Sequence, residues 1–111
     1  MLQLIAHLIG DYCLQNQWMA DNKTKAWFPA VVHVTIYTLV CFVLLTHSWA
    51  ALAVIGGTHL LIDRFRLAGY WCRFYGVGAA PHVPPFLSVW LLIIVDNTIH
   101  LSINYAALLY L

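Results

Sequence analysis

Three pairs of histidine and aspartate are the residues of this sequence best suited to chemistry. The two members of each pair are four positions apart, and the pairs are His7 with Asp11, His59 with Asp63, and Asp96 with His100. Residues with this spacing lie on one face of a helix, one turn apart. Each pair can therefore offer an imidazole and a carboxylate together, as the paired histidines of metalloprotease helices do. This pattern predicts a metal site.

One further histidine, His33, stands alone in its apolar segment and adds a seventh potential ligand. The predicted metal-ligand set is therefore His7, Asp11, His33, His59, Asp63, Asp96 and His100. Imidazole and carboxylate together suit divalent transition metals better than calcium. We place zinc first, with manganese or iron as alternatives. Seven ligands could hold one ion, or two ions about 3.5 to 4 Å apart.

Four apolar segments must position these ligands. They cover about residues 1–19, 28–46, 49–67 and 86–109, and each is close to the roughly 20 residues that cross a bilayer. Hydrophobic residues make up 63% of the chain and charged residues 8%, against about 45 to 50% and about a quarter in soluble domains. The sequence predicts an all-α membrane protein, a single domain over residues 1–111 that forms a bundle of about four transmembrane helices.

The helical period also predicts where the polar residues lie within such a bundle. A carboxylate near the bilayer centre is costly, so the polar faces must point into the interior. At about 1.5 Å of rise per residue, one ligand of each span lies at a similar depth, and these ligands are Asp11, His33, Asp63 and Asp96. We therefore expect all four spans to deliver ligands at one level.

Basic residues indicate the orientation of the bundle. They fall in the first connection and at the end of the third span, at Lys23, Lys25, Arg64, Arg66 and Arg73. By the positive-inside rule this side is cytoplasmic, so both ends of the chain lie on the far side of a bacterial inner membrane. A net charge of +1 gives no electrostatic basis for nucleic-acid binding. The expected partner is membrane lipid, and the active unit is one chain or a homo-oligomer.

Two polar residues are candidates for binding a substrate. Arg66 follows Asp63 by three positions and shares its face at the cytoplasmic mouth, where it could bind phosphate. Gln15 extends the polar stripe of the first span beyond Asp11. The alternative for Arg66 is a membrane anchor that reaches lipid headgroups, which is the better interpretation of the other two arginines.

Three runs of residues resemble a family of small bacterial and phage integral-membrane proteins of unknown function. They are HLIGDYCLQ at 7–15, THLLIDRFR at 58–66 and VDNTIHL at 95–101. The resemblance covers nearly the whole chain. It implies functional positions at His7, Asp11, Gln15, His33, His59, Asp63, Arg66, Asp96 and His100. In residue type and helix placement the pattern is also similar to that of membrane-bound metal-dependent hydrolases.

These observations favour a membrane-embedded, metal-dependent hydrolase that acts on a lipid or another amphiphile. A metal ion would activate water, and Asp11 or Asp96 would serve as the catalytic base if not used as a ligand. One alternative is a protein that binds or transports metal ions or protons. Another is a phage or prophage membrane component without catalysis. In the simplest interpretation, each histidine only neutralises its aspartate inside the bundle.

Overall fold

The computed structural model describes residues 1–111 and contains helices and connecting segments only. In chain order the elements are α1 (Leu2–Leu8), η1 (Ile9–Cys13), α2 (Gln17–Asn22), α3 (Trp27–Leu44), α4 (Trp49–Phe65), α5 (Leu67–Tyr75) and α6 (Pro85–Tyr110). The short element η1 is a π-helical turn that continues α1. The predicted all-α class is therefore confirmed.

Local sequence explains where several of these helices begin and end. The side chain of Asn16 accepts a hydrogen bond from a backbone N–H in the first turn of α2, and Ser48 caps α4 in the same way. Pro85 opens α6, where its missing N–H leaves no bond unmade. Gly76 ends α5 with a φ of 81°, a conformation that glycine adopts without steric cost.

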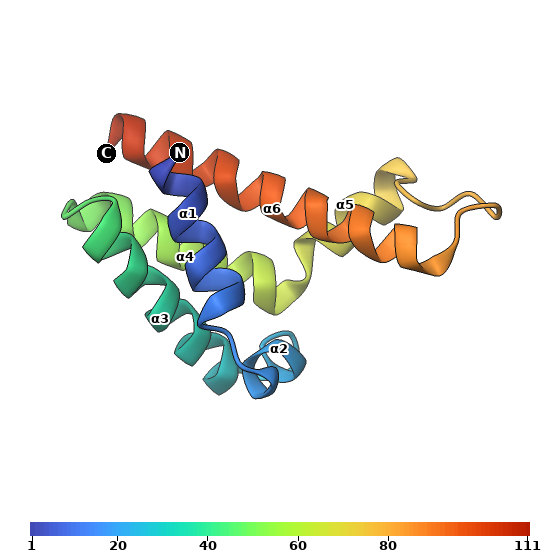
Figure 1. Ribbon diagram of the computed structural model, residues 1–111, viewed down its shortest axis with the longest axis horizontal. Helices are drawn as coiled ribbons and strands as arrows, with labels where there is room; N and C mark the ends of the chain where they lie inside the picture. Colours follow the sequence, from blue (N-terminus) through green and yellow to red (C-terminus); the bar gives the residue numbers. More distant parts are fainter.

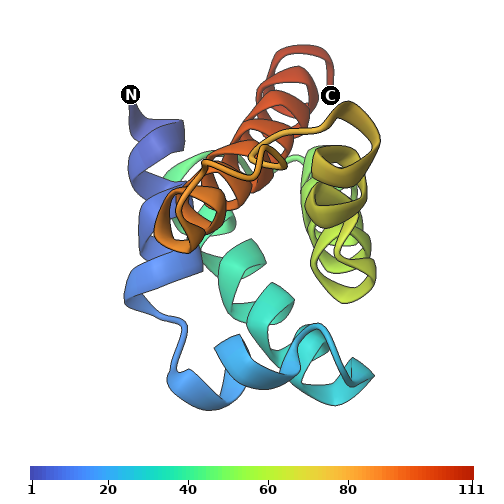
Figure 2. The same cartoon turned by 90° about the vertical axis from the view of Figure 1, so that its right-hand side faces the viewer.

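The longer helices pack around a common interior. Helix α4 lies between α3 and α6, and α1 with η1 contacts both α3 and α6 (Figure 1). An end-on view shows α1, α3, α4 and α6 arranged around the centre, with α2 folded back beneath α3 (Figure 2). Both ends of the chain lie toward the same end of the bundle as the turn between α3 and α4 (Figure 1). At that turn the Ser48 hydroxyl donates to the Leu111 carbonyl at 2.8 Å. The opposite end carries α2 and the junction of α4 with α5.

The interior of the bundle is polar and its surface is apolar. Seven of the 21 buried residues are polar or charged, namely His7, Asp11, His33, His59, Asp63, His100 and Asn104. Large apolar side chains point outward instead: Phe28 and Val43 are each 71% exposed and Trp90 is 60% exposed. This distribution is the reverse of that in water-soluble domains, where charged residues are almost never fully buried.

Two of the four predicted spans do not appear as membrane-crossing helices. Only α3 and α6, with 18 and 26 residues, are long and apolar enough to cross a membrane. The predicted 1–19 span is interrupted after η1, because the chain leaves the helix at Leu14 and Asn16 starts a new one. The predicted 49–67 span ends at Phe65, because Arg66 adopts a left-handed conformation with φ 56°. Its last two turns also carry His59 and Asp63, which make it less apolar.

Glycine permits the closest approach between helices around the site. A Cβ atom on Gly10 would lie 2.7 Å from a ring carbon of Tyr37, which is too close for any real side chain. A Cβ atom on Gly56 would lie 2.6 Å from the Thr38 hydroxyl oxygen. These two contacts bring η1 and α4 close to adjacent positions of α3, which helps to bring their polar residues together.

Candidate metal centre

Four buried ligand atoms converge between η1, α3 and α4. His33 Nε2 lies 3.0 Å from Asp11 Oδ1, 3.1 Å from His59 Nε2 and 3.3 Å from Asp63 Oδ2. His59 Nε2 lies 3.5 Å from Asp11 Oδ1 and 3.2 Å from Asp63 Oδ2. All four atoms are within 4.8 Å of one another, and all four residues are buried. These four residues are called the four-ligand group below.

The separations within the four-ligand group fit a tetrahedral metal. Zinc binds nitrogen and oxygen ligands at about 2.0 to 2.2 Å, which places the corners of a regular tetrahedron about 3.3 to 3.6 Å apart. The five separations above range from 3.0 to 3.5 Å. Hydrogen bonding alone accounts poorly for this cluster, because a neutral imidazole has one N–H and cannot donate to several neighbours at once. The residues therefore could hold a metal ion.

Several buried atoms of the four-ligand group have no hydrogen-bond partner. They are Nδ1 of His33, Nδ1 of His59 and Oδ2 of Asp63. Each imidazole therefore makes its polar contacts through Nε2, on the side that faces the other ligands. A buried polar atom without a partner costs about 1 to 3 kcal/mol. At the Asp63 oxygen this cost is offset by the Lys23 ammonium, whose Nζ lies 2.9 Å away.

The backbone explains how each ligand reaches this point. His59 and Asp63 are one turn apart on α4, as their spacing predicted. Asp11 lies within the π-helical turn, an irregularity that is frequent at functional sites because it redirects side chains. His33 is on the buried stripe of α3 with Tyr37 and Cys41. Three elements thus supply the group.

A second set of possible ligands adjoins the first. It consists of Asp11, Asp96 and His100, whose ligand atoms also lie within 4.8 Å of one another. His100 Nε2 lies 3.2 Å from Asp63 Oδ1 and 3.4 Å from Asp96 Oδ2. Asp11 belongs to both sets, and Asp63 contacts both through its two oxygens. The structure therefore brings six of the seven predicted ligands around two adjacent points.

The seventh predicted ligand, His7, belongs to neither of these two sets. Its Nδ1 is 2.7 Å from the Tyr37 hydroxyl and its Nε2 is 2.9 Å from Asn97 Oδ1. The nearest Asp11 oxygen is 3.6 Å away. Because both nitrogens of His7 already have partners, its ring supports the ligands from outside the four-ligand group.

Stacked rings fix the orientation of the imidazoles. The Tyr37 ring stacks on His59 with centroids 3.9 Å apart, and His59 stacks on His100 at 4.0 Å. The Tyr37 hydroxyl accepts a hydrogen bond of 2.7 Å from Asn104 Nδ2. These contacts hold three rings from three helices in one column, which limits how far each imidazole can turn.

A cation from the first connection also reaches the centre. Lys23 Nζ lies 2.9 Å from Asp63 Oδ2 and 3.6 Å from Asp11 Oδ1, so its ammonium is within ion-pair distance of both carboxylates. Burial alone would lower the pKa of Lys23, but the Asp63 and Asp11 carboxylates outweigh it and the pKa is raised. Lys23 is therefore charged at neutral pH and competes with a metal ion for the same two carboxylates.

A cavity of about 480 Å³ opens beside the ligands at the basic end of the bundle. Its polar lining residues are Asp11, Tyr12, Gln15, Lys23, Thr24, Asp63, Arg66 and Asp96. The structure thus places the predicted substrate-binding residues and both predicted catalytic residues around one space. Its volume is in the range of small-molecule sites. This space is called the ligand cavity below.

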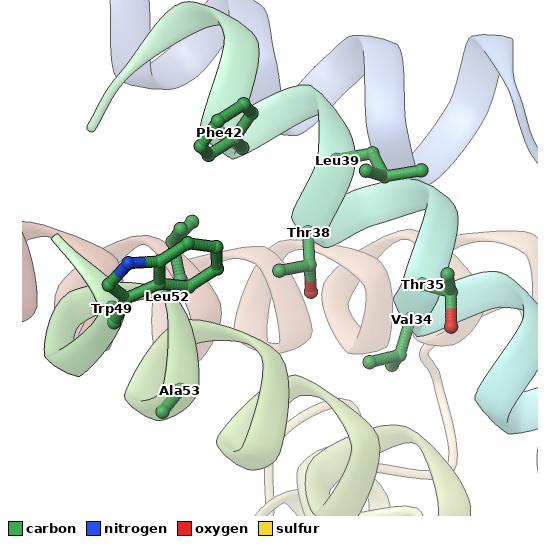
Figure 3. A pocket seen from close by; sticks show the side chains of 8 residues that line it. All are labelled: Val34, Thr35, Thr38, Leu39, Phe42, Trp49, Leu52 and Ala53. Carbon is green, nitrogen blue, oxygen red and sulfur yellow. The ribbon is translucent and has the colours of Figure 1, made fainter. Parts of the chain in front are cut away.

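A cavity of similar size on another face is lined by no metal-ligating or charged side chain. It lies between α3 and α4, has a volume of about 470 Å³ and is lined mainly by apolar side chains (Figure 3). Its polar atoms come from Thr35, Thr38 and the indole of Trp49. Since none of its residues is a metal ligand or titrates near neutral pH, the ligand cavity is the candidate site.

Comparison with known sequences places the chain in a family. The model of a family described as "Protein of unknown function (DUF3307)" matches residues 1–110. The chain belongs to this family. No curated protein and no solved structure matches it. The predicted resemblance to a family of unknown function is confirmed, whereas the predicted bacterial and phage membrane character of that family stays a prediction.

Sequence reasoning missed three residues of the site. Lys23 was assigned only to the basic connection, and nothing in its spacing shows that α2 folds back toward the ligands. Tyr37 had a detectable signal, because it follows His33 by four positions and so shares its face. Asn97 is an amide within an apolar helix, which by itself suggests a polar partner in the interior.

Proposed function

We propose that the protein is a membrane-embedded, metal-dependent hydrolase that acts on a lipid or another amphiphile. The observation that carries this proposal is the convergence of the four-ligand group beside the ligand cavity, which two of its members, Asp11 and Asp63, line. A catalytic metal site needs fixed ligands and an accessible side. The two features occur together at one end of the bundle.

The apolar surface supports a location in the membrane. Few residues of α6 are buried, namely His100, Asn104 and Ala107, and large apolar side chains such as Trp90 and Ile94 are exposed. Trp18, Trp27 and Trp71 are all exposed near the basic end, as expected for residues at a membrane interface. We propose that α3 and α6 cross the bilayer and that α4 and the α1–η1 segment pack beside them. The basic end would face the cytoplasm.

The four-ligand group would hold the first ion, and zinc is our proposal for it. Two imidazoles and two carboxylates at tetrahedral separations suit zinc, while manganese and iron accept the same ligands. Asp96 and His100 would hold a second ion if one binds, and Asp11 would be a ligand of both ions. A bound divalent ion supplies a Lewis acid and an activated water.

The remaining polar groups have roles that follow from their positions. The Asp96 side chain is 27% exposed and lies outside the four-ligand group, so with a single bound ion it would take a proton from water and pass it to the leaving group. Asp11 is bound within that group, which makes it the weaker candidate for the base. Arg66 and Gln15, which both line the ligand cavity, would bind the polar part of the substrate while its apolar part stays in lipid.

Mass spectrometry of lipids tests this proposal together with elemental analysis. Lipid extract is incubated with the native protein, with Asp96→Asn and with Asp21→Asn, which changes an exposed aspartate outside the site. We expect bound metal in all three and loss of a lipid species with the native protein and the Asp21 variant only. Metal in the native protein with identical lipid profiles throughout would refute hydrolysis and leave metal binding.

A chain of polar contacts favours proton transport as a second candidate. From the four-ligand group, polar contacts continue through His7 and Tyr37 to Asn104, which lies on α6 toward the far end of the bundle. Tyr37→Phe breaks this chain and leaves the four-ligand group intact. In proteoliposomes with a pH-sensitive dye, transport requires fast proton flux in the native protein and slow flux in Tyr37→Phe, whereas equal flux favours hydrolysis.

A further inference from the structure

We propose that the cleft between α5 and α6 binds the phosphoryl group of the substrate through Arg66 and Arg73. This proposal rests on the proposed hydrolase function and specifies its substrate class as a phosphorylated amphiphile. The cleft has a volume of about 390 Å³. Both guanidinium groups line it, and no acidic side chain does.

Both arginines are free to bind an anion. Neither guanidinium forms an ion pair or a side-chain hydrogen bond within the chain. Arg64, by contrast, donates to the Thr24 carbonyl at 3.0 Å and packs over the Trp27 ring. Two guanidinium groups that share a cleft provide the forked donors that bind phosphate in a bidentate manner.

The backbone holds the two arginines in place. Arg66 is the only non-glycine residue with a positive φ, at 56°, a conformation that costs free energy and persists where the surroundings require it. Arg66 lies between the end of α4 and the start of α5. Arg73 is on α5, where its guanidinium lies 4.6 Å from the centre of the Tyr70 ring. The two side chains thus come from α5 and from the N-cap residue that precedes it.

The cleft adjoins the ligand cavity. Arg66, Gly69 and Leu92 line both this cleft and the ligand cavity. An anion held by the arginines would therefore lie beside the space that Asp63 and Asp96 line. The other walls of the cleft include Phe65 and Leu92, which suit the apolar part of an amphiphile.

The exposed face of α5 indicates that the amphiphile enters from the membrane interface. Trp71, Phe74 and Tyr75 are 48%, 84% and 72% exposed. Aromatic rings on a short helix with a strong apolar face are typical of interfacial segments. The same face would place the cleft at headgroup level, where a phosphorylated lipid meets it without leaving the bilayer.

Titration calorimetry of the detergent-solubilised protein, stripped of metal with a chelator, tests the phosphoryl site. The probes are short-chain phosphatidic acid, short-chain phosphatidylcholine and inorganic phosphate. We expect phosphatidic acid to bind most tightly, because both the phosphate and the acyl chains find partners. Arg66→Gln and Arg73→Gln should each weaken its binding about tenfold or more. Arg73→Lys should weaken it less, since it retains the charge.

Lys25→Gln is the matched control, because it removes an exposed positive charge at the same end and lies outside both cavities. It should change binding less than twofold. An equal loss in Lys25→Gln and Arg73→Gln, or no binding of phosphatidic acid by the native protein, would overturn the proposal. If inorganic phosphate binds more tightly than phosphatidic acid, the ligand of the cleft is a soluble phosphate, and the proposal of a phosphorylated lipid is overturned.

Metal content, measured separately on the same variants before chelation, keeps the two proposals apart. If Arg73→Gln binds as much metal as the native protein but binds phosphatidic acid more weakly, the result supports both the metal-dependent hydrolase and the phosphoryl site. Arginine-dependent binding in a native protein that holds no metal would retain the phosphoryl site and refute the metal-dependent hydrolase.

Discussion

Replacement of Lys23 by methionine should tighten metal binding. The Lys23 ammonium lies 2.9 Å from one ligand atom and 3.6 Å from another, so a metal ion can occupy the four-ligand group only if this ammonium moves away. The ligand cavity gives it a place to go, because Lys23 lines that space as well. Methionine keeps the length and packing of the side chain and removes the competing charge.

The magnitude follows from the contact that the metal must break. Hydrogen bonds and close contacts to charged groups contribute about 1.5 to 3 kcal/mol, and each 1.4 kcal/mol changes an equilibrium constant about tenfold. The zinc dissociation constant of Lys23→Met should therefore fall by about one to two orders of magnitude. Without metal the same variant should be less stable, because two buried carboxylates lose their cation.

Competition with a fluorescent zinc chelator measures the dissociation constant, and thermal unfolding with and without zinc measures stability. Lys25→Met is the control, since it removes an exposed charge from the same connection and should leave both quantities unchanged. The expected pattern for Lys23→Met is a lower melting temperature without zinc and a larger rise when zinc is added. Weaker zinc binding than in the native protein would refute the competition and make Lys23 a partner of the metal.

The remaining predictions concern the ligands, the orientation and the mouth of the site. Asp63→Asn should lower zinc occupancy sharply in mass spectrometry of the purified protein, because a neutral amide leaves the cation undercompensated, while Asp21→Asn should keep it. A periplasmic reporter fused after Leu111 should be active, and activity of a cytoplasmic reporter there would refute the orientation. His59→Ala should abolish both metal binding and turnover. Arg66→Ala should raise KM for the substrate and leave metal binding unchanged. Loss of bound metal in Arg66→Ala would show that Arg66 has a structural role.

The sequence by itself determined the all-helical fold and predicted the six residues that meet in the two possible ligand sets. The spacing of four in His59–Asp63 places both side chains on one face whatever else the helix contacts, because that relation depends only on helical geometry. A lone histidine in an apolar segment must likewise turn toward other polar groups. His33 therefore meets Asp11 and His59 in the structure, as its position predicted.

Tertiary structure decided which of the paired residues contact one another and what else joins them. Spacing could not show that the His7 ring contacts Tyr37 and Asn97. The direction of the helix face that carries His7 depends on the π-helical turn and on the close packing at Gly10. Nor could spacing show that Lys23 reaches Asp63, since that contact arises only after the chain leaves the helix beyond η1 and folds α2 back beneath α3. Local periodicity fixes relations within a helix, whereas relations between helices depend on the breaks that end them and on the side chains that fit where they cross.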